Sequence, residues 1–301
     1  MYNKTKILGE LLLIKSLLFL ILPIFIFANS VSLQILGSGG PEFSQRASSS
    51  YLIWVDGKAR ALIDVGGGAF LRFTQSGAKI EDLKFIALTH LHIDHSADLP
   101  AFMKAGFFSK RVKPLPIIGT ISRGDFPNIS DYLQRLFGAK GAYAYMQDIL
   151  TTQSDSFELK PIMFDQGFNS KNFGNITVGA VGVTHGKIPA IAYCINIGGK
   201  KIVFGGDTSA SSNNLIKLAQ GADYLVVHHA ITQESGRFAK LLHATPKRIG
   251  EVARQANVKN LILSHRMKRT YGSEDKTLRE IRENFKGNIV WAEDLLTIPI
   301  P

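Results

Sequence analysis

The stretch Thr89–His95 reads THLHIDH and places three histidines and one aspartate within six consecutive residues, in a chain of 301 residues that has only 8 histidines. A single histidine here could be an ordinary turn or core residue, but so dense a run is rare by chance. Residues two apart in an extended segment point to the same side, so His90 and His92 can present their rings to one cation. Asp94 and His95 face other directions, and a second cation is the simplest interpretation. Imidazole and carboxylate ligands without thiolate indicate two divalent ions, zinc first, with manganese or iron as alternatives.

Other segments of the chain end in the same types of residue. Three apolar runs close on a hydroxyl residue followed by a histidine, at His90, His185 and His265. A fourth run, KIVFGGD, closes on Asp207. One strand-end histidine is usually a capping or core residue, whereas four such ends indicate that separate strands deliver side chains to one edge of a sheet. The sequence therefore predicts one site assembled from distant segments.

The rest of the chain alternates short apolar runs, bounded by turn residues, with stretches of helical character. Thr245 is a candidate N-cap and Pro246 a first helical residue. We expect helices over residues 97–108, 129–138, 212–220, 245–256 and 275–285. This mixture predicts an α/β fold, and no Pro/Gly/Ser-rich linker divides the chain, so residues 31–301 are expected to form a single domain.

Residues 1–30 have the pattern of an export signal. Three lysines precede an apolar run at 16–27, and a small-x-small pattern, Ala28-Asn29-Ser30, follows it. An uncleaved anchor is the alternative interpretation, but the run is shorter than the ~20 residues that a spanning helix needs. We therefore expect a removed signal peptide, a periplasmic or secreted product, and no stable membrane anchor after cleavage.

The charge of the chain favours an anionic partner. Removing residues 1–30 takes away three lysines and one glutamate, so the net charge falls from +11 to +9. The basic residues are spread out, which indicates solubility and mild attraction of anions rather than a dedicated nucleic-acid surface. We expect a small anionic ester as substrate, and nucleic acid is a less favoured alternative. Cys194 is the only cysteine, so no intrachain disulfide can form. A homodimer is an expectation that the sequence does not test.

The segment THLHIDHSADLP resembles the His-x-His-x-Asp-His signature of metallo-β-lactamase-fold hydrolases. The resemblance covers nearly all of the mature chain, through the segments ALIDVGGG (61–68), GVTHG (182–186), FGGDTS (204–209) and LILSHR (261–266). The spacing and the segment LLHAT (241–245) resemble the branch of ribonuclease Z-type phosphodiesterases and zinc arylsulfatases. Many true β-lactamases instead carry a cysteine at the position of Asp207 and lack a ligand at that of His95.

This resemblance implies a four-layer αββα sandwich that holds two metal ions. One ion would be held by His90, His92, His185 and Asp207. The other would be held by Asp94, His95, Asp207 and His265, so that Asp207 bridges the two. Asp64, in ALIDVGGG, would orient a ligand histidine from behind, although an ordinary turn aspartate is an equal alternative.

The same resemblance implies roles in hydrolysis. A metal-bridging hydroxide would attack the ester, Asp94 would accept a proton from the bridging water, and His243 would protonate the leaving oxygen. Ribonuclease Z-type enzymes usually carry a His-Glu pair where this chain has His228 and His229, so His229 takes the place of the glutamate that supports His243. The chain also lacks a long Gly/Pro-rich arm. Both departures, together with export, argue against tRNA 3′-end processing.

The function predicted from the sequence is an exported, binuclear-zinc hydrolase that cleaves a small or cyclic nucleotide-like phosphodiester. The alternative is an aryl or alkyl sulfate ester hydrolase. A tRNA endonuclease, a β-lactamase and a non-catalytic metal-binding module are less favoured, the last because none of the seven expected ligands is missing. The sequence of residues 137–175 gives the weakest secondary-structure signal of the chain. We hypothesise that these residues contain a loop that determines substrate specificity.

Overall fold

The computed structural model describes residues 30–151 and 156–301. The expected signal peptide, residues 1–30, lies outside the described residues except for Ser30. In the described ranges, no helix combines the length and the apolar character needed to cross a bilayer.

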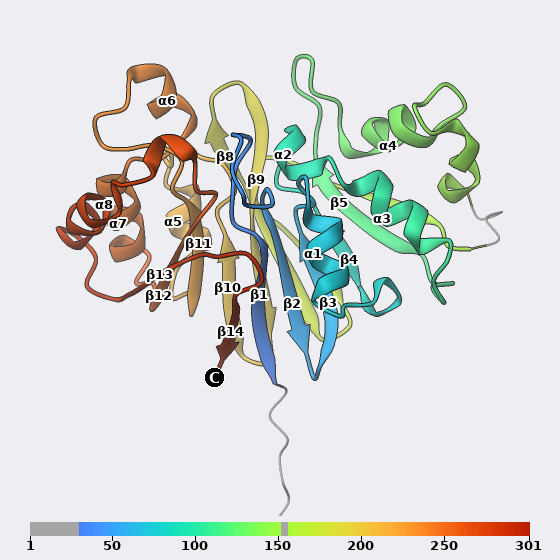
Figure 1. Ribbon diagram of the computed structural model, residues 1–301, viewed down its shortest axis with the longest axis horizontal. Helices are drawn as coiled ribbons and strands as arrows, with labels where there is room; N and C mark the ends of the chain where they lie inside the picture. Colours follow the sequence, from blue (N-terminus) through green and yellow to red (C-terminus); the bar gives the residue numbers. More distant parts are fainter. Residues whose placement is uncertain (1–29, 152–155) are drawn as a thin grey trace, which may run out of the picture.

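Two seven-stranded sheets form the centre of the molecule (Figure 1). The first sheet has the order β14 (Thr297–Ile300), β1 (Val31–Gly37), β2 (Ser50–Val55), β3 (Lys58–Ile63), β4 (Phe85–Ala87), β5 (Leu115–Thr120) and β6 (Leu159–Phe164). The second has the order β13 (Asn288–Trp291), β12 (Asn260–Ser264), β11 (Tyr224–His228), β10 (Lys200–Phe204), β9 (Ile188–Ile197), β8 (Ile176–His185) and β7 (Asn169–Phe173).

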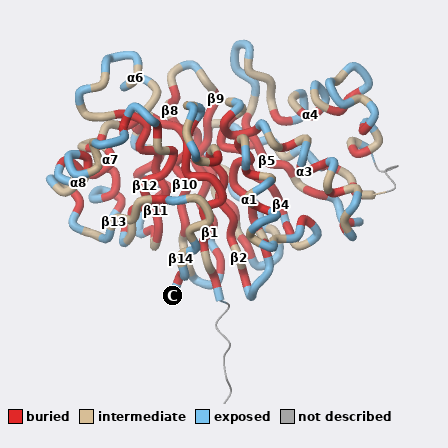
Figure 2. The backbone as a smooth tube through the Cα atoms, viewed as in Figure 1, coloured by how far each residue is buried: buried red, intermediate tan, exposed pale blue. Residues whose placement is uncertain are grey.

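Alternation along the strands builds a core on each side of a sheet. In β9, Ile191, Tyr193 and Ile195 belong to the apolar cluster between the two sheets. The residues between them, among them Ala192 and Cys194, face the other way and join the cluster under the outer helices. Because successive side chains of a strand point to opposite faces, a strand buried on both sides reads as a continuous apolar run. Figure 2 shows the resulting buried interior.

Helices cover the outer face of each sheet. The first sheet is covered by α1 (Ala69–Gln75), α3 (Leu99–Gly106) and α4 (Ile129–Phe137), and the second by α5 (Asn214–Leu218), α7 (Pro246–Gln255) and α8 (Glu274–Arg282). The short helices α2 (Ile93–Ser96) and α6 (Arg237–Leu242) lie at the upper edge of Figure 1. Helix α7 starts as predicted, with the Thr245 hydroxyl accepting a hydrogen bond from the Arg248 amide at 3.5 Å. The four-layer αββα sandwich expected from the sequence is confirmed.

Strand direction brings the predicted ligands to one edge. Strands β3 to β6 are parallel to one another, as are β10 to β13. Strand β8 has the direction of β10, because both are antiparallel to β9. The carboxyl ends of β4, β8, β10, β11 and β12 therefore converge where α2 and α6 lie.

Candidate metal centre

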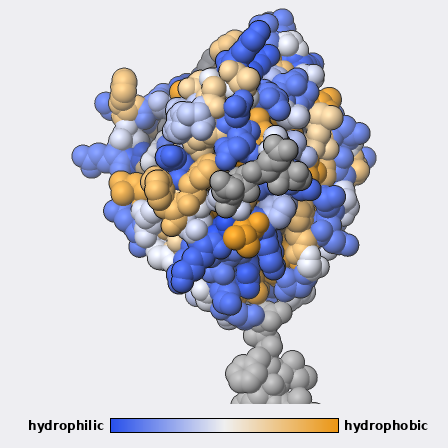
Figure 3. Space-filling view, turned by 90° about the vertical axis from the view of Figure 1, so that its right-hand side faces the viewer, coloured by the Kyte–Doolittle hydropathy of each residue, from blue (hydrophilic) through white to orange (hydrophobic). Residues whose placement is uncertain are grey.

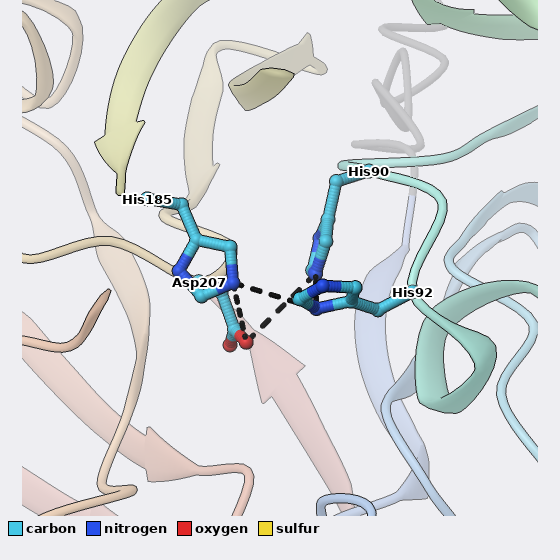
Figure 4. A group of neighbouring side chains, drawn as sticks. All are labelled: His90, His92, His185 and Asp207. Carbon is cyan, nitrogen blue, oxygen red and sulfur yellow. Dashed lines mark hydrogen bonds and ion pairs between the residues drawn. The ribbon is translucent and has the colours of Figure 1, made fainter. Parts of the chain in front are cut away.

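Four of the predicted ligands form a first group at this edge (Figure 4). One potential ligand atom from each of His90, His92, His185 and Asp207 lies within 4.8 Å of the others. His90 Nε2 lies 3.0 Å from His92 Nδ1, which lies 3.4 Å from His185 Nε2. The set is the one that the resemblance implied for the first metal ion.

A second group lies on the other side of Asp207. His95, Asp207, His228 and His265 again bring four potential ligand atoms within 4.8 Å of one another. Asp94 Oδ2 adjoins this group, at 3.0 Å from His265 Nε2 and 3.5 Å from His95 Nε2. The structure therefore brings together all the residues expected around the second ion and adds His228 to them.

Asp207 has the geometry of a bridge. Its Oδ2 faces the first group, at 3.5 Å from His185 Nε2 and 3.8 Å from His90 Nε2. Its Oδ1 faces the second group, at 3.5 Å from His265 Nε2 and 3.8 Å from His95 Nε2. One carboxylate could thus offer an oxygen to each of two cations held by the two groups.

The sequence reasoning missed His228 as a site residue. His228 ends β11, which lies between β10 and β12, the strands that lead to Asp207 and His265. Its Nδ1 contacts Asp207 Oδ1, and its ring stacks on that of His265 with centroids 4.5 Å apart. The sequence alone could not place it, because the position of β11 between β10 and β12 is known only from the folded chain.

His229 is not brought to the predicted position beside His243. Its Nε2 lies 2.8 Å from the hydroxyl of Thr277 in α8, and its ring packs against Trp291. Adjacent residues at a strand end face opposite ways, so His228 and His229 cannot both face the centre. In the described part of the chain, no contact joins His229 to His243.

The imidazoles of the centre are mostly held neutral. Burial lowers the pKa of His90 well below its ordinary value, and the neighbouring His95 lowers it further. Burial also lowers the pKa of His228, to about 3. His95 differs: burial lowers its pKa, but the negative charge and hydrogen bond of Asp64 outweigh burial and raise it well above the ordinary value. A neutral imidazole has the free lone pair that binds a metal ion.

The two carboxylates of the centre are held ionised. Burial by itself would raise the pKa of Asp94, but the hydrogen bond from His265 and the neighbouring His95 outweigh burial and lower it. Asp207 is also buried, yet the charge of His265 and the contact with His228 lower its pKa well below the ordinary value. Anionic oxygen ligands are therefore ready for cations.

Partners behind the ligands fix the orientation of their rings. Asp64 Oδ2 lies 2.8 Å from His95 Nδ1, and its Oδ1 accepts hydrogen bonds from the amide and hydroxyl of Thr89. This is the position predicted for Asp64. His185 Nδ1 lies 2.8 Å from the Leu242 carbonyl, which leaves Nε2 to face the centre. Such partners select the tautomer and orientation of a metal-binding histidine.

Backbone strain also marks the centre. Asp64 has φ of 57° and His265 has φ of 52°, in the left-handed region that residues other than glycine rarely adopt. Residues held there cost about 1–3 kcal/mol each and are common at functional sites. Both residues belong to the centre or support it.

The donor atoms fit two divalent ions. A tetrahedral ion with bonds of about 2.0–2.1 Å to nitrogen places its ligand atoms roughly 3.3 Å apart, close to the 3.4 Å between His92 Nδ1 and His185 Nε2. In the second group, His95 Nε2 is buried and has no hydrogen-bond partner among the described residues. Bound cations would satisfy both the converging nitrogens of the first group and this orphaned buried nitrogen.

A cavity of about 260 Å³ opens above the centre. Its base includes His92, Asp94 and Asp207, and its wall carries His243. His243 Nδ1 lies 4.0 Å from Asp207 Oδ1 and has no hydrogen-bond partner in the described ranges. Burial lowers the pKa of His243 to about 4. The ring therefore stands beside the centre with a buried Nδ1 that makes no hydrogen bond to a described residue.

A sandwich of this architecture with such a centre at its edge defines the class of metal-dependent hydrolases with the metallo-β-lactamase fold. Residues 60–266 match the family described as Beta-lactamase superfamily domain. The chain belongs to this family.

Individual relatives and solved structures agree with this family assignment. Ribonuclease Z of Enterococcus faecalis is 26% identical over 310 residues, which cover 90% of this chain and 98% of the relative. The metallo-beta-lactamase fold protein YhfI from Bacillus subtilis superposes with a TM-score of 0.69 at 20% identity, and human tRNase Z, short form, with 0.68 at 22% identity. Each of the two superpositions covers 90% of this chain and 99% of the other. The chain is similar to these proteins over almost its whole described length.

Proposed function

We propose that the protein is an exported hydrolase of small phosphodiesters. The observation that carries the proposal is the shared aspartate: Asp207 presents one oxygen to each of two ligand groups, beside a cavity that holds His243. A pair of neighbouring cations suits a tetrahedral, anionic phosphorus centre. The relatives named ribonuclease Z support the bond type, because the bonds that join nucleotides in RNA are phosphodiesters.

The two ions, once bound, would activate a water molecule and stabilise negative charge on the oxygens of the ester. The two residue groups described above would hold them. Asp94 lines the cavity as a carboxylate and can accept a proton from the attacking water. His243 lies on the cavity wall, where its free Nδ1 can donate a proton or a hydrogen bond to the leaving oxygen. Asp64 and the Leu242 carbonyl keep the ligand rings in place.

The proposal is tested with the chain that begins at Val31 and three p-nitrophenyl substrates: the bis-aryl phosphodiester, the phosphomonoester and the sulfate ester. We expect kcat/KM for the diester to exceed the other two by at least about 10-fold. A chelator should abolish the rate, and added zinc should restore it, because both ligand groups need a cation to act. Faster sulfate hydrolysis, or cleavage of precursor tRNA without cleavage of the small diester, would contradict the proposal.

A further inference from the structure

The cavity above the centre is small for a diester with two organic groups. Its volume of about 260 Å³ lies below the roughly 300–1,000 Å³ of typical ligand sites. Its wall next to His243 is formed by helix α6, through Phe238 and Leu242. A leaving oxygen that faces His243 places the leaving group along this wall. The other organic group of the diester must then extend out of the cavity.

A second hollow adjoins the cavity and offers that space. This outer hollow has a volume of about 560 Å³ and is lined by Pro41, Glu42, Phe43, Lys268 and Arg269. Pro41 and Arg269 line the cavity above the centre as well. The two spaces therefore adjoin, with Pro41 and Arg269 between them.

Ion pairing holds the loop that forms the outer hollow. Arg269 Nε lies 2.5 Å from Glu42 Oε1, and the Arg269 amide donates a hydrogen bond of 3.1 Å to Glu42 Oε2. The residue next to Glu42 is Phe43, whose side chain is 99% exposed. The loop is thus fixed next to an aromatic ring that other described residues leave uncovered.

The outer hollow combines this ring with an unpaired cation. Lys268 lines it and makes no ion pair within residues 30–151 and 156–301. An exposed aromatic face beside a positive charge is how proteins bind a planar base attached to a phosphate, and stacking changes affinity by a factor of about 5 to 150 per base. The chemistry fits an aromatic or heterocyclic group on an anionic ester.

We propose that the outer hollow binds the retained organic group of the diester, and that this group is a planar aromatic or heterocyclic ring stacked on Phe43. This inference rests on the phosphodiesterase function proposed above and names the class of substrate. Lys268 and Arg269 line the hollow in which this group would lie, and the charge of Lys268 favours the anionic phosphate to which the group is attached.

The test compares bis(p-nitrophenyl) phosphate with methyl p-nitrophenyl phosphate, which have the same leaving group and charge and differ in the retained group. Their kcat/KM ratio is measured for the wild type and for Phe43→Ala, so that intrinsic reactivity cancels between the two proteins. We expect the ratio to fall about 10-fold in Phe43→Ala and to be preserved in Phe43→Trp. Phe108→Ala, which removes a ring that is 83% exposed near the end of α3, should keep the wild-type ratio.

An unchanged ratio in Phe43→Ala would overturn the inference and leave the phosphodiesterase function standing. A wild type that hydrolyses neither diester would overturn the proposed function, and the inference with it.

Discussion

Asp207 is the residue on which both ligand groups depend. Its two oxygens face different groups, so Asp207→Asn replaces one of two anionic donor atoms with an amide nitrogen that binds cations poorly. We expect the zinc content to fall from about two to one or fewer ions per chain, and the rate to fall with it. Elemental analysis beside the diester assay measures both quantities.

A matched substitution controls for the chemical change. Asp275→Asn makes the same replacement at an exposed position in the first turn of α8. It should keep the metal content and rate of the wild type. Two full ions in Asp207→Asn would show that the carboxylate does not bridge.

His243 separates chemistry from metal binding. It lies on the cavity wall and belongs to neither ligand group. We expect His243→Ala to keep about two ions per chain and to lose about 10²–10⁴-fold in kcat, the usual scale of general acid catalysis. The loss should be smaller for nitrophenyl than for alkyl leaving groups, which depend more on a proton. Equal losses across a leaving-group series, or loss of metal, would assign His243 a different role.

The sequence predicted the ligands better than it predicted their neighbours. The spacing of His90 and His92 identifies them as ligands. The matching strand ends identify Asp207 and His265. His228 and His229 could not be separated in this way, because two adjacent histidines give no sign of which one faces the centre. Strand register decides it: His228 pairs with Ser264, next to His265. The assignment of His229 as a partner of His243 lacked this information.

At the scale of elements, the turn after β3 supports the helix that carries Asp94. A Cβ on Gly66 would lie 2.1 Å from the Asp94 carbonyl oxygen, whereas one on Gly67 would meet only Ser48 Oγ at 4.0 Å. We expect Gly66→Ala to displace Asp94, weaken zinc binding and lower the melting temperature by several degrees. Gly67→Ala makes the same change one residue later and should leave zinc affinity and melting temperature close to those of the wild type. Similar behaviour of the two variants in zinc titration and calorimetry would contradict this role of Gly66.

Helices whose apolar residues face the core at regular spacing could be predicted from the sequence, whereas a short exposed helix could not. The expected helices at 129–138 and 245–256 correspond closely to α4 and α7, whose apolar residues recur at helical spacing toward a sheet. Helix α6 was not expected, because it spans only six residues and buries none of them. Phe238 and Leu242 instead line the cavity above the centre, which exists only in the folded molecule.

For the whole molecule, we expect cleavage of the export signal to leave the fold intact. The first strand begins at Val31, directly after the small-x-small pattern. Removal of residues 1–30 takes away the hydrogen bond that the Ser30 amide donates to Asp56 Oδ1 at 3.0 Å, but no residue of β1. Cell fractionation followed by N-terminal sequencing should find a chain that begins near Val31 outside the cytoplasm. Full-length protein in the cytoplasm would contradict export and would strengthen the case for an RNA substrate.

The surface carries both hydrophilic and hydrophobic areas. Figure 3 shows hydrophilic side chains over much of one face, interrupted by smaller hydrophobic areas. Several large apolar side chains are exposed elsewhere in the described chain, among them Phe43 and Phe238 beside the substrate cavity. Composition could not predict this placement, because it depends on which loops meet at the strand ends.

The pairing of β1 with β14 determines when this molecule can finish folding. Val31 lies opposite Ile300 and Gln34 opposite Thr297, so the first described strand is covered on one side by the last. A chain still attached to the ribosome lacks that partner, and contacts so far apart in sequence form slowly. Completion of the first sheet must therefore wait until β14 has been synthesised. Until then one edge of β1 has no partner strand, and an unpaired strand edge is open to pairing with another chain.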